Sequence, residues 1–143
     1  MLVSKTFYVD TTKNTDILLV SHELRRVVNE ARPELGQVTV IIPFPGAAVC
    51  MFDKDVSREA LTKELTPYVK NQLIQCLLPK SLVVLVEKGK MVTDPWQDVF
   101  LIDFESTGRR REFRVCLFSE TAAASGPGKP GAAPVPPPPT GGR

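Results

Sequence analysis

The sequence has few of the side chains that most often carry chemistry near neutral pH. It contains one histidine, His22, and three cysteines without CxxC spacing among its 143 residues. An odd number of cysteines placed in apolar runs favours neither a disulfide framework nor a structural metal site. We therefore expect reduced core cysteines in a cytoplasmic protein, a surface position for His22, and no metal site.

The sequence also lacks an excess of charge and a long apolar run. Lys and Arg total 18 against 16 Asp and Glu, and Lys129 and Arg143 both follow Glu120, so residues 1–120 are neutral. A neutral domain has no global field to attract nucleic acid or a membrane surface. No run approaches the roughly 18 apolar residues of a membrane span, and Met1–Asp10 holds no apolar leader segment. We expect a soluble protein with neither nucleic acid nor membrane as a partner.

The end of the chain lacks large apolar residues. Residues 121–143 hold seven of the 13 prolines and five of the nine glycines. Such a composition cannot bury enough surface to offset the entropy of ordering. We predict one domain over residues 1–120 and a disordered Pro/Gly/Ala-rich tail over residues 121–143. Pro134–Pro137 fits the loose spacing of SH3 ligands, but a solvated extension is the simpler interpretation, and any partner of the tail is left open.

The remaining pattern alternates strands with two amphipathic helices. Ser21 is expected to cap the first helix, whose apolar residues from Leu24 to Ala31 form one stripe. Ser57 is expected to begin the second, with Leu61 and Leu65 on one face. The predicted strands cover residues 3–10, 37–43, 47–52, 82–86, 99–104 and 112–119. This order predicts an α+β domain, with two helices packed on one side of a mostly antiparallel or mixed sheet.

The segment Ser81–Glu120 carries the site hypothesis. Its three closely spaced strands are expected to form a meander, and in the last of them the residues alternate between apolar and polar, as in a half-buried strand. A meander would bring Asp94–Gln97 and Arg109–Arg111 to sheet ends, where polar side chains can converge on a ligand.

These same residues carry a family resemblance. The pair Trp96-Gln97, the Phe-rich strand after it and the arginine cluster resemble the C-terminal half of the YjbQ-like proteins, sometimes labelled secondary thiamine-phosphate synthases. The resemblance extends back to the start of the chain and ends at Glu120. It implies the YjbQ-like fold, homotrimers with sites between subunits, and transferase chemistry on phosphorylated thiamine precursors.

Most of the chemical residues that the resemblance implies are replaced. The family histidine in His-Thr-Thr-Ala falls on Phe44, and a later family histidine falls on Gln72, which cannot exchange a proton near neutral pH. An acidic residue is kept as Asp53, one methylene shorter than the family glutamate. The remnant candidates for a site are therefore Asp53, Gln72, Trp96 and Gln97, and none of them is assigned as a catalytic residue.

Three arginines remain as candidates for binding an anion. Arg109, Arg110 and Arg111 could hold a small phosphorylated ligand, because a guanidinium group pairs well with phosphate. The alternative is a solvated strand edge that resists edge-to-edge pairing. Trp96 could wall a pocket, or lie in the core or at a subunit interface. Mg²⁺ is expected as a cofactor only if the protein is active, with Asp53 as a ligand.

The sequence thus favours a divergent YjbQ-like protein that is non-catalytic or repurposed for anion binding or assembly. The alternative is a weak thiamine-phosphate synthase-like transferase. The two alternatives differ in whether another group takes over the proton transfer that the missing histidines would perform.

Overall fold

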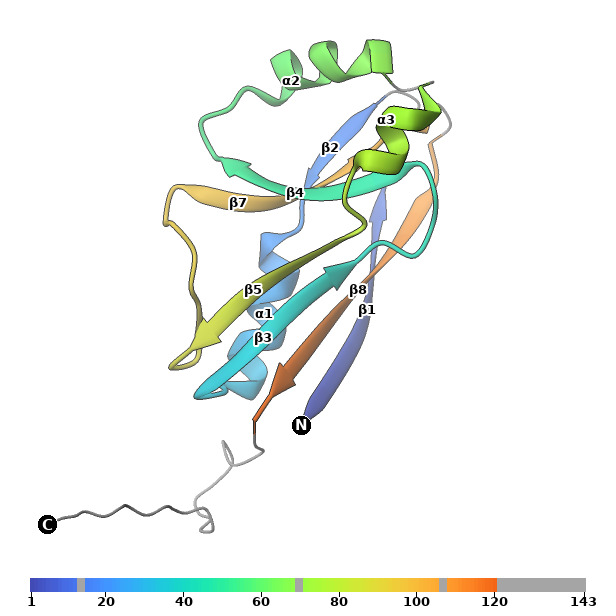
Figure 1. Cartoon of the computed structure of the whole chain (residues 1–143). Helices are drawn as coiled ribbons and strands as arrows, with labels where there is room; N and C mark the ends of the chain where they lie inside the picture. The colour runs from blue at the N-terminus through green and yellow to red at the C-terminus, as the bar shows by residue number, and fades with distance from the viewer. Residues whose placement is uncertain (13–14, 69–70, 106–107, 121–143) are drawn as a thin grey trace, which may run out of the picture.

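A computed structural model describes residues 1–12, 15–68, 71–105 and 108–120 (Figure 1). The predicted tail over residues 121–143 lies outside these residues, so its disorder stays a prediction. Among the described residues, no helix is both long and apolar enough to cross a membrane.

Two antiparallel sheets form the frame of the domain. The larger sheet has the strand order β1-β8-β3-β5-β6 and the smaller has the order β2-β7-β4, with every pair antiparallel. The prediction of an α+β domain with a mostly antiparallel sheet is confirmed. In chain order the elements are β1 (Leu2–Asp10), β2 (Asp16–Leu19), α1 (Ser21–Ala31), β3 (Leu35–Ile41), β4 (Ala47–Asp53), α2 (Arg58–Leu65), a 3₁₀ turn (Thr66–Tyr68), α3 (Gln72–Leu77), β5 (Ser81–Glu87), β6 (Lys90–Met91), β7 (Gln97–Asp103) and β8 (Arg110–Ser119).

The main core lies between α1 and the inner faces of both sheets. Leu24, Val27 and Val28 of α1 are buried in it, which confirms the apolar stripe predicted for this helix. The alternation predicted for the last strand is also present, because every second residue of β8 from Phe113 to Leu117 is buried. Period-two burial on the strands and a 3.6-residue stripe on the helix therefore meet in one apolar cluster.

Strand β7 is buried on both faces. Its residues Val99 and Leu101 belong to the main core, whereas Phe100 and Ile102 belong to a second cluster on the other face of the small sheet. Helix α2 covers that second cluster through Leu61 and Leu65. Figure 1 accordingly shows α2 above the small sheet and α1 below it.

The predicted meander is wrong. Strands β5, β7 and β8 do not pair with one another: β7 lies in the small sheet between β2 and β4, and β8 lies between β1 and β3. The physical reason is the two-sided apolar pattern of β7, which needs cover on both faces. Pairing in the small sheet places β7 between two apolar layers.

Ser57 and Ser21 have different roles. Ser57 caps α2, with its hydroxyl accepting a hydrogen bond from the Ala60 N–H at 3.2 Å, so the helix begins where it was predicted to begin. The prediction for Ser21 is wrong, because Val20 holds the cap position and makes no side-chain cap bond. The buried Ser21 hydroxyl instead accepts a hydrogen bond from the Val99 N–H at 2.7 Å, which ties α1 to β7.

The outer face of the large sheet is apolar over much of its width. Leu2 pairs with Phe118 across β1 and β8, and Gln37 of β3 pairs with both Phe118 and Leu85. The exposed fractions of Leu2 and Phe118 are 68% and 61%, although antiparallel sheets usually present polar side chains to water. α1 lies behind this sheet, and no described element lies in front of it (Figure 1). The outer-sheet patch comprises Leu2, Leu35, Val83, Leu85 and Phe118.

Candidate functional site

The most buried cation among the described residues is Arg111, the second residue of β8. Its Nε donates to Asp103 Oδ2 at 3.1 Å and its Nη2 donates to Asp103 Oδ1 at 3.3 Å, which makes a bidentate pair. Arg111 is 5% exposed and Asp103 is 1% exposed. The Arg111 Nη2 also lies 3.4 Å from Glu105 Oε1. One guanidinium therefore faces two carboxylates.

Phe44 closes this ion-pair cluster from the side. The Arg111 Cζ lies 4.4 Å from the centroid of the Phe44 ring, which is a cation–π distance. Phe44 is half-buried and packs against the main core. The position where the family resemblance implies a histidine thus holds an aromatic ring stacked on a neutralised arginine. The backbone holds Phe44 near Arg111, because the Phe104 N–H donates to the Gly46 carbonyl at 2.7 Å and so joins the turn after Phe44 to the end of β7.

The other two arginines also have carboxylate partners. Arg109 Nη2 lies 3.3 Å from Glu105 Oε1, and Arg110 Nε lies 3.2 Å from Asp10 Oδ1. Both pairs are on the surface, where water and salt screen them. The cluster as a whole therefore brings three guanidiniums together with three carboxylates, and an incoming anion would compete with Asp10, Asp103 and Glu105. Anion binding at Arg109–Arg111 stays a prediction, with this competition against it.

Three of the remnant candidates come together at the opposite end of β7. Asp53 pairs in register with Gln97, and the Lys54 N–H donates to the carbonyl of Trp96 at 2.8 Å. Trp96 is 68% exposed, so it is not a core residue. Its backbone is held by Asp94, whose Oδ1 accepts from the Trp96 N–H at 2.8 Å.

The structure does not bring Trp96 and the arginine cluster together within one chain. The seven residues of β7 between them span about 20 Å at the usual rise of a strand. Gln72 is the first residue of α3, whose N-terminus is capped by the Asn71 side chain; the Gln72 side chain lies outside the described atoms. The single converged site expected from a meander is therefore absent among the described residues.

Metal binding has little support from the described side chains. No group of three or more His, Cys, Asp or Glu side chains in this part of the chain is placed to hold an ion. Mg²⁺ prefers several oxygen ligands, and the candidate Asp53 is the exposed end of strand β4, paired with Gln97. Within residues 1–12, 15–68, 71–105 and 108–120, no set of side chains offers the several oxygen ligands that Mg²⁺ prefers.

One cysteine has a perturbed thiol. Cys50 lies on β4 under α2, and burial raises the pKa of its thiol from 9.0 to about 11. A thiol with this pKa is protonated at neutral pH, so it is a poor nucleophile. Cys50 is a packing residue of the second cluster, as expected from the sequence, whereas the core position expected for Cys76 is wrong because Cys76 is exposed.

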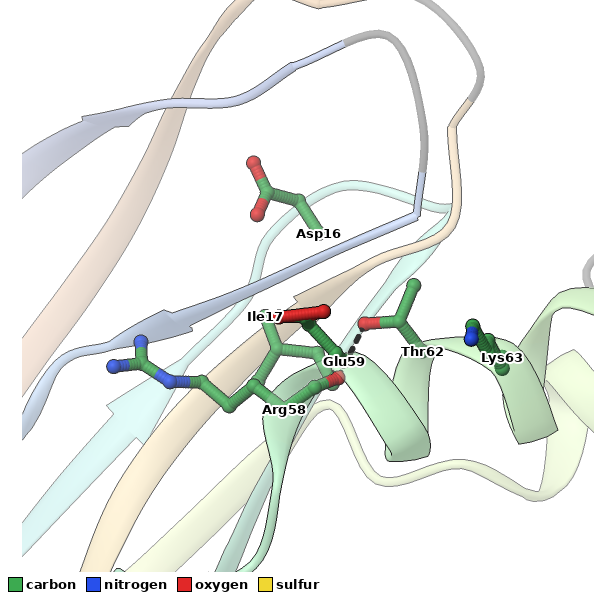
Figure 2. A pocket seen from close by; sticks show the side chains of 6 residues that line it. All are labelled: Asp16, Ile17, Arg58, Glu59, Thr62 and Lys63. Atoms are coloured by element: carbon green, nitrogen blue, oxygen red, sulfur yellow. Dashed lines mark hydrogen bonds between the residues drawn. The ribbon is translucent and has the colours of Figure 1, made fainter.

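A groove of about 430 Å³ lies between β2 and α2 (Figure 2). Figure 2 shows Arg58 extending beside β2, while the Asp16 carboxylate points away from it; Asp16 accepts a hydrogen bond from the Thr12 N–H at 3.1 Å. The groove contains two acidic and two basic side chains, so it offers no net charge to select an ion. Its lining residues are Asp16, Ile17, Arg58, Glu59, Thr62 and Lys63.

Sequence reasoning missed the partners of Arg111. Asp103 is an acidic residue at the end of a run that is otherwise apolar, and a charge in such a run is rarely buried without a partner. That signal could have identified Arg111 as a structural residue. The outer-sheet patch had a weaker signal, since Leu82–Val86 is apolar at every position.

Comparison with known proteins agrees with the fold. A sequence model of the family described as UPF0047 protein YjbQ-like matches residues 5–120. A YbjQ-like protein of unknown function from Sulfolobus solfataricus P2 superimposes with a TM-score of 0.74 and 17% identity, over 84% of this chain and 99% of that chain. A protein of the yjbq/UPF0047 family from Clostridium acetobutylicum gives a TM-score of 0.68 and 19% identity, over 80% and 99% of the two chains.

A hypothetical protein from Aeropyrum pernix K1 gives a TM-score of 0.68 and 17% identity, over 82% of this chain and 99% of that one. None of the curated proteins matches this chain. Identities this low show a shared fold and carry no site residue from one protein to another. The fold and the match over residues 5–120 together show that the chain belongs to the YjbQ-like family, UPF0047.

Proposed function

We propose that this protein is a non-catalytic assembly protein that forms a homotrimer through the outer-sheet patch. The observation that carries the proposal is the patch itself. Its five side chains are each at least 43% exposed, and they lie on neighbouring strands of one sheet. Exposed apolar surface of this kind marks an interaction site, because burying it is favourable by about 25 cal/mol per Å².

The geometry of a trimer adds a requirement. Contacts in a closed ring of three are heterologous, so the patch of one protomer covers a different surface of the next. A single substitution in the patch then weakens all three contacts. A charged residue there is costly, because it would be buried at the interface without a partner.

The non-catalytic half of the proposal rests on the surroundings of Phe44. The place that the family resemblance assigns to a histidine holds a ring packed on Arg111, whose charge is already satisfied by Asp103 and Glu105. General acid–base catalysis needs a group that exchanges protons near the working pH. His22 is exposed at the first turn of α1, and α1 begins next to Val99 near the middle of β7, away from this cluster.

Sedimentation velocity of the full chain tests the assembly. The expected result is a trimer that dissociates when Phe118→Lys or Val83→Lys is introduced. Leu73→Lys is the matched control, because Leu73 is 68% exposed on α3 and lies outside the patch. A wild-type protein that stays monomeric at tens of micromolar, or a trimer that both patch variants leave intact, would overturn the proposal.

A turnover assay tests the absence of catalysis. The phosphorylated pyrimidine and thiazole precursors of thiamine are the substrates implied by the resemblance, and no product above background is expected. Turnover that disappears in Asp53→Asn or Gln97→Ala would instead support the weak transferase. These two residues are suitable because both lie at a surface strand end, where substitution leaves the core intact.

A further inference from the structure

Three described cations without an ion-pair partner lie together at one corner of the fold, far from the arginine cluster. Arg32, Lys88 and Lys90 line a cavity of about 340 Å³ between the end of α1 and the β5–β6 hairpin. No ion pair within the described residues joins any of the three to a carboxylate, in contrast with Arg109–Arg111. We call this cavity the hairpin notch; its lining is Asn29, Arg32, Glu34, Lys88, Gly89 and Lys90.

Two cations of the hairpin notch lie where the backbone has positive φ. Arg32 and Lys88 have φ values of 47° and 52°, and they are the only non-glycine residues with positive φ among the described residues. Both conformations are usual for their places, because Arg32 is the left-handed C-cap of α1 and Lys88 begins the two-residue turn Lys88-Gly89 between β5 and β6. Here both positions carry long cationic side chains, and both side chains line the same cavity.

The notch is also held in place by the backbone. The Lys88 N–H donates to the Glu34 carbonyl at 2.8 Å, and the Gly89 N–H donates to the Pro33 carbonyl at 2.9 Å. These bonds fix the tip of the hairpin against the connection between α1 and β3. The cations therefore project from a preorganised frame, which lowers the entropy cost of binding a ligand.

The local charge favours an anion. Three cations face one carboxylate, Glu34, in the lining. The C-terminal end of α1 contributes about half a negative charge, which reduces the excess of positive charge without cancelling it. Arg32 offers a guanidinium fork for two phosphate oxygens, and the Asn29 amide offers a further donor.

A second recess adjoins the notch and shares Asn29 and Lys90 with it. This recess has a volume of about 250 Å³, and its lining includes Val28, Met91 and Thr93. Arg25 in its wall is already paired with Asp98 at 3.0 Å. The recess thus provides apolar and neutral polar contacts next to the cationic notch. Together the two volumes fall in the usual range for small-ligand sites.

We propose that the hairpin notch binds the phosphate group of a small phosphorylated molecule, with the organic part of the ligand in the adjoining recess. Arg32, Lys88 and Lys90 hold the phosphate, and Met91 contacts the organic part. The notch shares no residue with the outer-sheet patch, although Glu34 of the notch directly precedes Leu35 of the patch.

Amide NMR shifts of the full chain test this site, with inorganic pyrophosphate and glycerol 3-phosphate as probes at constant ionic strength set by chloride. The expected result is saturable shifts at Asn29, Arg32, Lys88 and Gly89. The double variant Lys88→Asn/Lys90→Gln should bind at least tenfold more weakly, because it removes two of the three cations. Asn is chosen at position 88 because it tolerates positive φ. The matched control Arg114→Gln, which removes a surface charge from β8 outside both the notch and the arginine cluster, should bind as the wild type does.

Three results would overturn the proposal. The first is shifts that do not saturate or that chloride alone reproduces. The second is equal binding by the double variant, with Lys90→Gln alone used as the check if the double variant is unfolded. The third is binding to vesicles that contain a phosphoinositide but to neither soluble probe, which would assign the notch to a membrane surface instead.

Discussion

Removing the charge of Arg111 should destabilise the domain far more than removing the charge of its neighbour Arg110. Arg111 and Asp103 are 6% and 1% exposed at their side chains, whereas Arg110 and Asp10 are 70% and 74% exposed. Breaking a buried pair by removing one partner costs about 3–5 kcal/mol, because the remaining charge stays buried without compensation. Breaking a surface pair costs less than about 1 kcal/mol.

Urea unfolding of Arg111→Met and Arg110→Met at equal protein concentration measures this difference. For a domain of this size, 3 kcal/mol corresponds to a fall in Tm of about 12 °C. The double variant Arg111→Met/Asp103→Leu should recover most of the loss, because it removes both charges at once. If Arg111→Met loses less than about 1 kcal/mol, the pair is not the buried structural element described here, and Arg111 is free for a ligand.

Two further predictions concern groups in the core. Ser21→Ala should lower the free energy of unfolding by about 1–3 kcal/mol, because the buried Val99 N–H loses its acceptor. Its control is His22→Ala at the exposed neighbouring position, which should change the free energy of unfolding by no more than about 0.5 kcal/mol. Equal effects of the two substitutions in urea unfolding would contradict this role of Ser21. Cys50 should react slowly with iodoacetamide at pH 8, because about one thiol in a thousand is ionised there when the pKa is about 11. Its labelling should accelerate as the pH rises toward 11. If mass spectrometry shows that Cys50 is modified as fast as the exposed Cys76 at pH 8, the burial of Cys50 is contradicted.

Local features of this fold can be predicted from the sequence because their causes lie within a few residues. The alternation in β8 and the stripe of α1 depend only on the period of the local structure. The start of α2 at Ser57 likewise depends on one hydroxyl and an N–H three residues later. Each of these predictions is confirmed.

Strand pairing could not be predicted in the same way, because it depends on which apolar faces must be covered. A meander is the simplest arrangement of β5, β7 and β8, but it would leave one apolar face of β7 without a layer to pack on. The same limit applies to the site. Asp103 and Arg111 are eight residues apart across a connection, and only the three-dimensional pairing shows that one neutralises the other.

The double-sided burial of β7 has a consequence for how the domain comes apart. From Asp98 to Asp103 every residue of this strand is buried, and its two faces serve two separate apolar clusters. Neither apolar cluster can be exposed to water without displacing β7, which would expose the other cluster as well. The layers beneath α1 and α2 are therefore expected to melt together as one cooperative unit, and the amide protons of β7 should exchange with solvent only when the whole domain unfolds.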